Sequence, residues 1–220
     1  MTPERFARIR AVLDKRQPDL TVLMENVHKP HNYAAVVRSC DAVGCFQAHG
    51  VLRDKNLSNK LASAAGARKW VEVVNHEDVR TAVSHLKKRG FAVMAANLSE
   101  QSVDYRDHDF TKPTCVLLGQ ELDGVTEEAL ALADGEIHAP MHGMVESLNV
   151  SVAAAVMLFE AQRQRTKAGF FSSPRLDPDT YRRALFQWAQ PDIADYCDRH
   201  DFEYPALNEI GELAEPLPRR

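Results

Sequence analysis

Three stretches of the sequence carry polar side chains whose types could take part in chemistry. The first, HKPHNYAAVVRSCDAVG, holds Asn32 and Arg38 on a predicted helix of residues 32–44. A guanidinium matches the oxygens of a phosphate with two parallel hydrogen bonds, so Arg38 is a candidate phosphate ligand. The alternative for Arg38 is an ordinary surface ion pair. Asn32 is a predicted N-cap of that helix.

The second stretch, LLGQELDG, follows an apolar run that predicts a buried strand. Gly119 and Gly124 lie in the predicted turn after it. Glycine would let a ligand approach the backbone closely there, and two ordinary turn glycines explain the pattern equally well. Glu121, between them, is either a helix-capping acid or a carboxylate of the site.

The third stretch, MVESLNVSVAAAVMLFEAQRQR, places Ser147 and Asn149 at the start of a predicted helix of residues 147–165. Both are good capping residues for the exposed N–H groups of a helix. Capping explains one of them and leaves the second, and Ser151, without a task. A helix amino terminus also suits an electronegative ligand, so both residues are candidates for a site.

Alternating strands and helices must position these residues. Apolar runs predict strands at residues 20–25, 46–53, 70–75, 91–98, 115–121 and 135–141. Helical patterns at residues 32–44, 76–90, 126–134 and 147–165 separate them, except that none is predicted between the second and third strands or the fourth and fifth. This alternation favours an α/β fold, a mainly parallel sheet with helices on both faces. Ligands of such sheets bind beyond the carboxyl ends of the strands, which predicts a site in loops 95–102, 118–124 and 139–149.

The two ends of the chain differ from this pattern. PERFARIRAVLDKRQPDL predicts an amphipathic helix with Thr2 as N-cap, and Pro18 marks its exit. A linker rich in Gly, Ser and Pro begins at Lys167 and leads to a helical appendage. Phe171, Tyr181 or Trp188 could stack on bases, and we favour core packing for them. We therefore expect an N-terminal helical extension (1–18), an α/β domain (19–168), and a C-terminal helical extension with an acidic tail (169–220).

Composition excludes several classes of protein. The net charge of −4 argues against indiscriminate binding to nucleic acid. No apolar run approaches the roughly 20 residues of a membrane span, and the first residues lack the apolar block of a secretory signal. The four cysteines form no CxxC pair, so we expect neither a metal site nor a disulfide framework. A reduced, cytoplasmic compartment is the natural expectation.

Four stretches, in their order along the chain, resemble the motifs of the SpoU (SPOUT) RNA 2′-O-methyltransferases: KPHNYAAVVRSCDAVG, ASAAGARKW, LLGQELDGVTEEAL and IHAPMHGMVESLNVSVAAAVMLFE. Within that superfamily, RIRAVLDKRQPDLTVLMENVHKPHN and FEAQRQRTKAG are similar to the branch that methylates guanosine in tRNA. The resemblance covers roughly residues 1–170. Four motifs in the right order are far more specific than a single glycine pattern.

The resemblance implies a fold, a cofactor and a reaction. The fold is a parallel α/β domain whose C-terminal part forms a deep trefoil knot, in a homodimer with its site at the subunit interface. The reaction transfers a methyl group from S-adenosylmethionine (AdoMet) to the ribose 2′-hydroxyl of guanosine 18 in the D-loop of tRNA. A ribosomal RNA methyltransferase and a catalytically silent RNA-binding relative are the alternatives. The implied AdoMet-binding residues are Ala96, Asn97, Gly119, Glu121, Ala139, Met141 and Leu148.

The resemblance also assigns the catalytic residues Arg38, Asn32, Ser147 and Asn149. In the family Arg38 activates the 2′-hydroxyl with the help of an RNA phosphate. A guanidinium is an awkward base because it keeps its proton, so an equal alternative is that Arg38 clamps the phosphate while water or phosphate accepts the proton. We expect tRNA, and neither DNA nor a membrane, as the partner. The candidate RNA contacts are Arg8, Arg10, Lys15, Arg16, Lys60, Arg163, Arg165 and Lys167.

Overall fold

The computed structural model describes residues 1–51, 69–120 and 123–217. The chain forms two compact units. The sheet unit comprises Gln17–Phe170, and the terminal unit combines Met1–Arg16 with Phe171–Arg220. The sequence predicts two separate extensions at the ends of the chain, whereas the structure joins them in one unit. The reason is that each end presents an apolar helical face, and these two faces pack together.

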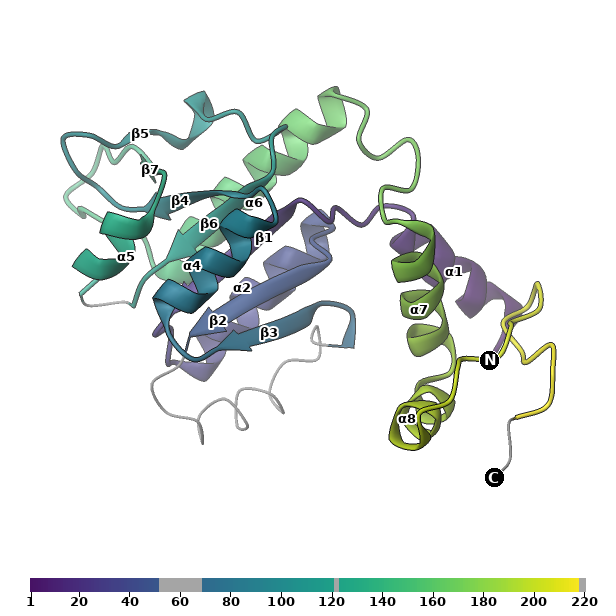
Figure 1. The fold of residues 1–220 in the computed structure, drawn as a ribbon. Coiled ribbons are helices and arrows are strands. Elements are labelled where there is room, and N and C mark those ends of the chain that lie inside the picture. Colours follow the sequence, from purple (N-terminus) through teal and green to yellow (C-terminus); the bar gives the residue numbers. More distant parts are fainter. Residues whose placement is uncertain (52–68, 121–122, 218–220) are drawn as a thin grey trace. The chain divides into compact units, whose positions relative to one another are not determined.

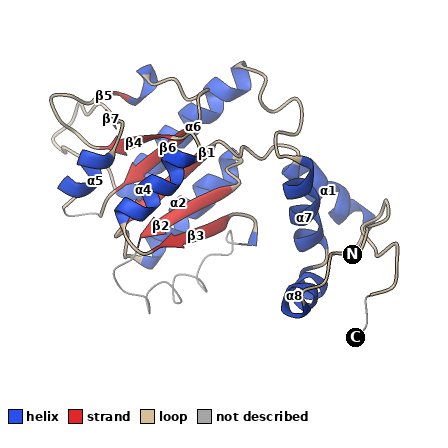
Figure 2. Ribbon diagram, viewed as in Figure 1, coloured by secondary structure: helices blue, strands red, loops and turns tan. Residues whose placement is uncertain are grey.

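The sheet unit is built on parallel strands. Its described part contains seven strands in the order β3-β2-β1-β6-β4-β7-β5, and every recorded pairing between them is parallel (Figure 2). The mainly parallel sheet was predicted, but the short edge strand β5 was not. The strands are β1 (Leu20–Glu25), β2 (Gln47–Val51), β3 (Glu72–His76), β4 (Ala92–Ala96), β5 (Val103–Asp104), β6 (Thr114–Leu118) and β7 (Gly135–His138).

Helices cover both faces of this sheet, as predicted. The first face carries α2 (Pro30–Val43) and α6 (Val150–Lys167), and the second carries α4 (Val79–Lys88) and α5 (Glu127–Leu132) (Figure 1). Side chains of a strand point alternately to the two faces. In β1, Val22 and Met24 therefore join the core under α2 and α6, whereas Leu23 joins the core under α4 and α5. A short 3-10 helix, η2 (Tyr105–Asp107), follows β5.

The helix boundaries confirm some predicted caps and correct others. Asn149 caps α6, since its side chain accepts the N–H of Ser151, and Thr126 caps α5 through the N–H of Ala129. The prediction for Asn32 is wrong. Helix α2 begins earlier, at Pro30, whose fixed φ suits the first helical turn, and Asn32 is a buried residue inside the helix. Ser147 lies before the helix and does not cap it.

The terminal unit contains α1 (Pro3–Leu13), α7 (Pro178–Ala189) and α8 (Pro191–His200). The Tyr181 hydroxyl donates to Asp14 Oδ1 at 2.6 Å, and burial with this bond raises the pKa of Tyr181 to about 12. Trp188 is buried, which confirms its predicted core packing, and the guanidinium of Arg16 lies 5.1 Å from its ring centroid. Among the described helices, none combines the length and apolarity needed to cross a membrane.

Three histidines form a cluster between the sheet edge and α4. His49 of β2 is 1% exposed, and its Nδ1 lies 2.9 Å from Nε2 of His76 at the end of β3. The ring of His85, on α4, lies 5.7 and 5.3 Å from those two rings. Burial, with the charges of His76, His85 and Arg89, lowers the pKa of His49 from 6.5 to about 3. Burial also lowers the pKa of His76.

We expect this cluster to make the fold acid-sensitive. The folded protein keeps His49 neutral, whereas the unfolded chain binds a proton below about pH 6.5. The free energy of unfolding therefore falls as the pH drops from about 6.5 towards 3, by up to about 1.4 kcal/mol per pH unit. Urea unfolding between pH 7 and pH 4 checks this against His49→Gln, which cannot titrate. Equal pH dependence in both proteins would contradict the expectation.

Candidate active site

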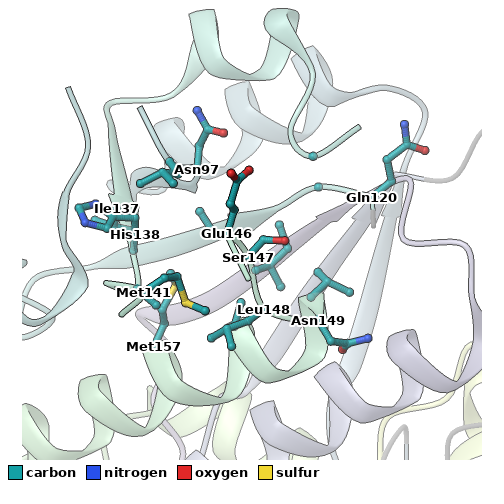
Figure 3. A pocket seen from close by; sticks show the side chains of 18 of the residues that line it. Asn97, Gln120, Ile137, His138, Met141, Glu146, Ser147, Leu148, Asn149 and Met157 are labelled. Carbon is teal, nitrogen blue, oxygen red and sulfur yellow. The ribbon is translucent and has the colours of Figure 1, made fainter. Parts of the chain in front are cut away.

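A cavity of about 420 Å³ opens beyond the carboxyl ends of β4, β6 and β7, in front of the amino terminus of α6 (Figure 3). Its walls come from the three loops that the sequence analysis singled out. This volume lies within the range of small-molecule sites. Six of the seven predicted cofactor-binding residues line it, namely Ala96, Asn97, Gly119, Ala139, Met141 and Leu148. The seventh, Glu121, lies outside the described residues.

The loop after β6 folds tightly back on itself. Gln120 and Gly124 exchange two backbone hydrogen bonds of 3.0 and 3.1 Å, and Gly124 has a φ of +68°. A Cβ on Gly119 would lie 2.1 Å from the carbonyl carbon and oxygen of Gly124. Glycine is therefore required at position 119 because the backbone of Gly124 approaches it closely. The prediction from the sequence considered only the approach of a ligand. This loop forms one wall of the cavity.

Two hydrogen bonds between strand-end segments stabilise the opposite wall. The Asn97 side chain, after β4, donates to Glu136 of β7 at 2.6 Å. The hydroxyl of Ser102 lies 2.9 Å from Nδ1 of His138, at the end of β7. No sequence pattern predicted Glu136, Ser102 and His138 as site residues, because only the pairing of β7 with β4 and β5 brings them together.

Asn149 connects the cavity to helix α2. Its Oδ1 accepts the N–H of Ser151 at 2.9 Å and the hydroxyl of Ser151 at 2.7 Å, which gives Ser151 the task that the sequence left open. Its Nδ2 donates to Oδ1 of the buried Asn32 at 3.3 Å. Ser147 and Asn149 both line the cavity and are exposed to solvent. The structure thus brings three of the four predicted catalytic residues together.

Arg38 is the fourth. It lies on the same helix as Asn32 but does not line the cavity, and its side chain is exposed. No hydrogen bond or ion pair joins Arg38 to another residue in the described part of the chain. The predicted alternative of a surface ion pair is therefore not seen within those residues. An exposed guanidinium without a partner among the described residues can bind an anion without first breaking a bond to one of them.

The cavity also carries charged residues that the sequence analysis did not select. Lys29 at the start of α2, Asp123 after β6 and Glu146 before α6 all line it. Figure 3 shows the side chain of Glu146 extending toward that of Asn97. The two carboxylates favour a ligand with positive charge. Asp123 and Glu146 belong to the loops singled out in the sequence, and their charge was the signal that could have identified them.

The predicted RNA contacts divide into exposed and buried residues. Arg8, Arg10 and Lys15 are exposed on the terminal unit, and Arg163 and Lys167 are exposed at the end of α6. Arg163 forms an ion pair of 2.8 Å with Glu160. Lys60 lies outside the described residues.

Arg16 and Arg165 contradict the prediction of RNA contact, because both side chains are fully buried. The interior acceptors of Arg165 include Asp19 Oδ1 at 2.5 Å and the carbonyl of Phe110 at 2.9 Å. Arg16 lies over the ring of Trp188, inside the terminal unit. Because it is buried, neither guanidinium can reach a phosphate from its position. The prediction failed because a sequence does not distinguish a charged residue at the surface from one in the interior.

The fold and the cavity define a class of protein. It is a parallel α/β protein with a small-molecule pocket at the carboxyl ends of central strands, closed by the amino terminus of a helix. The SpoU rRNA Methylase family matches residues 19–159, and the C-terminal SpoU rRNA methylase family matches residues 163–216. The chain belongs to the SpoU rRNA Methylase family.

Individual relatives agree with this assignment. The tRNA (guanosine(18)-2′-O)-methyltransferase of Escherichia coli (strain K12) is 47% identical over 215 residues, which are 97% of this chain and 94% of that protein. The TrmH/SpoU tRNA modifying enzyme of A. aeolicus has a TM-score of 0.76 and 39% identity, covering 86% of this chain and 97% of that one. The SpoU methyltransferase AviRb from Streptomyces viridochromogenes, in complex with the cofactor AdoMet, has a TM-score of 0.60 and 26% identity, covering 70% of this chain and 59% of that one.

Proposed function

We propose that this protein transfers a methyl group from AdoMet to the ribose 2′-hydroxyl of guanosine 18 in tRNA. The observation that carries the proposal is the position of Asn149, which lines the cavity, caps α6 and hydrogen-bonds Asn32 on the helix that bears Arg38. One residue thereby links a small-molecule pocket to the helix that carries the exposed guanidinium of Arg38. The E. coli relative, which matches nearly the whole chain, carries this activity in its name.

The residues of the cavity fit AdoMet. Ala96, Gly119 and Ala139 leave backbone groups accessible to a ligand, while Met141 and Leu148 offer apolar contact to a purine ring. Asp123 and Glu146 match the positive charges of a sulfonium and an ammonium. When bound, AdoMet supplies a methyl group on a positively charged sulfur, and the S–C bond breaks as the new C–O bond forms.

The chain must hold the ribose hydroxyl in line with the methyl group and stabilise the charge that develops on its oxygen. In our proposal Arg38 binds the phosphate next to the target ribose and so reduces the cost of that charge. A guanidinium keeps its proton at neutral pH, so the hydroxyl proton passes to water or to the phosphate. Asn32 and Asn149 hold the amino ends of α2 and α6 together, and Ser147 orients the substrate at the mouth of the cavity.

We further propose the deep trefoil knot, formed by the three loops at residues 95–102, 118–124 and 139–149, and a homodimer. Support for the dimer comes from apolar side chains left in solvent beside the site. Val152 and Phe159 lie seven residues apart on one face of α6 and are 45% and 49% exposed, and Met144 and Val145 precede that helix. A second copy of this face would cover them. A monomeric mass in solution would contradict the dimer.

The RNA arm of the proposal uses the exposed cations. Arg8, Arg10 and Lys15 in the terminal unit, and Arg163 and Lys167 in the sheet unit, would bind phosphates of a folded tRNA. The test is incubation with labelled AdoMet and unmodified transcripts, followed by mapping of the methylated ribose. We expect label in tRNA at guanosine 18 and none in a transcript with adenosine there. Label in ribosomal RNA alone, or in no RNA, would support the two alternatives instead.

Substitutions of Asn149 can separate a role in the active site from a role as the N-cap of α6. Asn149→Asp keeps the oxygen that accepts from Ser151 and loses the Nδ2 donor to Asn32. Because Asp is as good an N-cap as Asn, we expect the cap's contribution to thermal stability to be kept and turnover to fall strongly. Asn149→Ala should lose turnover and, in addition, about 1 kcal/mol of stability. Full turnover by Asn149→Asp would show that the residue serves only as a cap.

A further inference from the structure

A network of five hydrogen bonds surrounds Arg165, near the carboxyl end of α6. The guanidinium is fully buried and donates to five acceptors. Nε donates to the carbonyl of Phe110 at 2.9 Å, Nη1 to Asp19 Oδ1 at 2.5 Å and Gln17 Oε1 at 3.2 Å, and Nη2 to the carbonyls of Asp19 and Lys112 at 3.0 and 3.2 Å.

These contacts join the two places where the chain crosses between the units. Gln17 is the first residue of the sheet unit and Phe170 is its last. The Gln17 side chain donates to the carbonyl of Phe170 at 3.3 Å, and the Phe170 N–H donates to the carbonyl of Arg165 at 3.0 Å. The Arg165 guanidinium also lies 5.4 Å from the Phe170 ring centroid. We call Arg165, Gln17, Asp19 and Phe170 the Arg165 clasp.

The clasp lies far from the cavity. Fifteen residues separate Arg165 from Val150, the first residue of α6, and a helix rises about 1.5 Å per residue, so about 22 Å of helix lies between them. The clasp also involves the segments before β1 and β6, at the amino ends of the strands, whereas the cavity opens at their carboxyl ends. A change in the clasp therefore need not alter the cavity.

We propose that Arg165 is a positioning residue for tRNA, which acts by fixing both crossings between the units. Without the clasp, the segments around Gln17 and Phe170 would no longer be held to the sheet unit. They would become part of the two flexible connections, and the terminal unit would gain conformational freedom. Binding of RNA to the cations of that unit would then cost more conformational entropy, because a more mobile unit must be ordered. This inference rests on the proposed function, in which both units bind the same tRNA. Burial of the Arg165 guanidinium costs desolvation free energy, and a defined geometry where the chain crosses between the units would explain why a charged residue is found there.

The test weakens the clasp while leaving Arg165 in place, because removal of the guanidinium itself endangers the fold. Asp19→Asn removes the negative charge that faces the guanidinium, and Gln17→Ala removes one of its acceptors. We expect the KM for tRNA to rise about fivefold to tenfold in each, a coupling of ordinary size. AdoMet affinity, measured by calorimetry, should stay at the wild-type value, which also shows that the variants are folded.

Simple electrostatics makes the opposite prediction. Asp19→Asn makes the protein more positive, so a model in which Arg165 touches RNA predicts equal or tighter tRNA binding. Arg163→Ala is the matched control, since Arg163 lies two residues away on the exposed side of α6. If Arg163 binds a phosphate, its loss should reduce the slope of log affinity against log salt by about 1, whereas clasp variants should keep the wild-type slope.

Two outcomes would overturn the inference. One is wild-type tRNA affinity, by fluorescence anisotropy, in folded Asp19→Asn and Gln17→Ala. The other is a reduced salt slope in those two variants, which would indicate a lost phosphate contact. Failure of the proposed function looks different, because wild-type protein would then leave every transcript unmethylated. Wild-type tRNA affinity in Asp19→Glu, a single change that keeps a carboxylate at position 19, would support the clasp.

Discussion

Replacement of Arg38 by alanine should reduce methyl transfer by about 10²–10³-fold, the usual cost of losing one group that stabilises developing charge. AdoMet binding should stay unchanged, because Arg38 does not line the cavity. Its side chain is exposed and forms no hydrogen bond or ion pair within the described residues, so stability should change little. Single-turnover methylation with saturating AdoMet, together with calorimetry of AdoMet binding, measures both effects.

Arg80→Ala is the matched control for this change. Arg80 is also an exposed helical arginine, but it lies on α4, across the sheet from α2, where it pairs with Glu128 at 2.8 Å. We expect wild-type turnover from it. Arg38→Lys should restore only part of the activity, since a lysine cannot form the paired bonds of a guanidinium. Full turnover by Arg38→Ala would refute the role that we propose for this residue.

Gly119→Ala should abolish AdoMet binding. The new Cβ would lie 2.1 Å from the backbone of Gly124 and 2.3 Å from the N–H nitrogen of Val125, and neither backbone atom can move without opening the loop. Forcing a methyl group into a packed site commonly costs about 1–3 kcal/mol, and a clash with backbone belongs at the upper end. We therefore expect a lower melting temperature and no calorimetric signal with AdoMet.

Gly143→Ala is the control for the glycine experiment. Gly143 lies in the neighbouring loop before α6, and a Cβ there would meet nothing within 4 Å among the described residues. AdoMet affinity and melting temperature should both match the wild type. If Gly119→Ala also bound AdoMet normally, the tight return of the chain at Gly124 would not be needed for the pocket.

The fold followed from patterns that act locally. Apolar runs and helical periodicity predicted the parallel sheet with helices on both faces, and glycine and threonine marked helix ends such as Gly44 and Thr126. Asn32 shows where this reasoning fails. Asparagine is a good cap, but Pro30 two residues earlier already begins the helix, and the buried side chain at position 32 makes a tertiary contact instead. Its partner Asn149 lies 117 residues away, a distance that no local pattern spans.

The burial of Arg165 could not be predicted from the sequence either. Arg163, Arg165 and Lys167 form an alternating basic run, and charge alone predicts one role for all three. In the structure the helix turns Arg165 into the interior while Arg163 faces solvent. The decisive information was the set of acceptors around Asp19 and Phe110, which tertiary packing assembles from distant parts of the chain. The three loops of the cavity were identified because loops at strand ends must gather at one edge of a parallel sheet, whereas the six residues within them came from the resemblance to the family.

The cavity also has a bearing on biosynthesis. Of the described residues that line it, Lys29 alone precedes residue 96, and the others extend to Met157. A ribosome releases the amino-terminal part of a chain first, so strands β1 to β3 emerge long before the donor pocket has its walls. AdoMet therefore cannot assist the early half of folding, and the nascent protein gains its ligand only when α6 has left the exit tunnel.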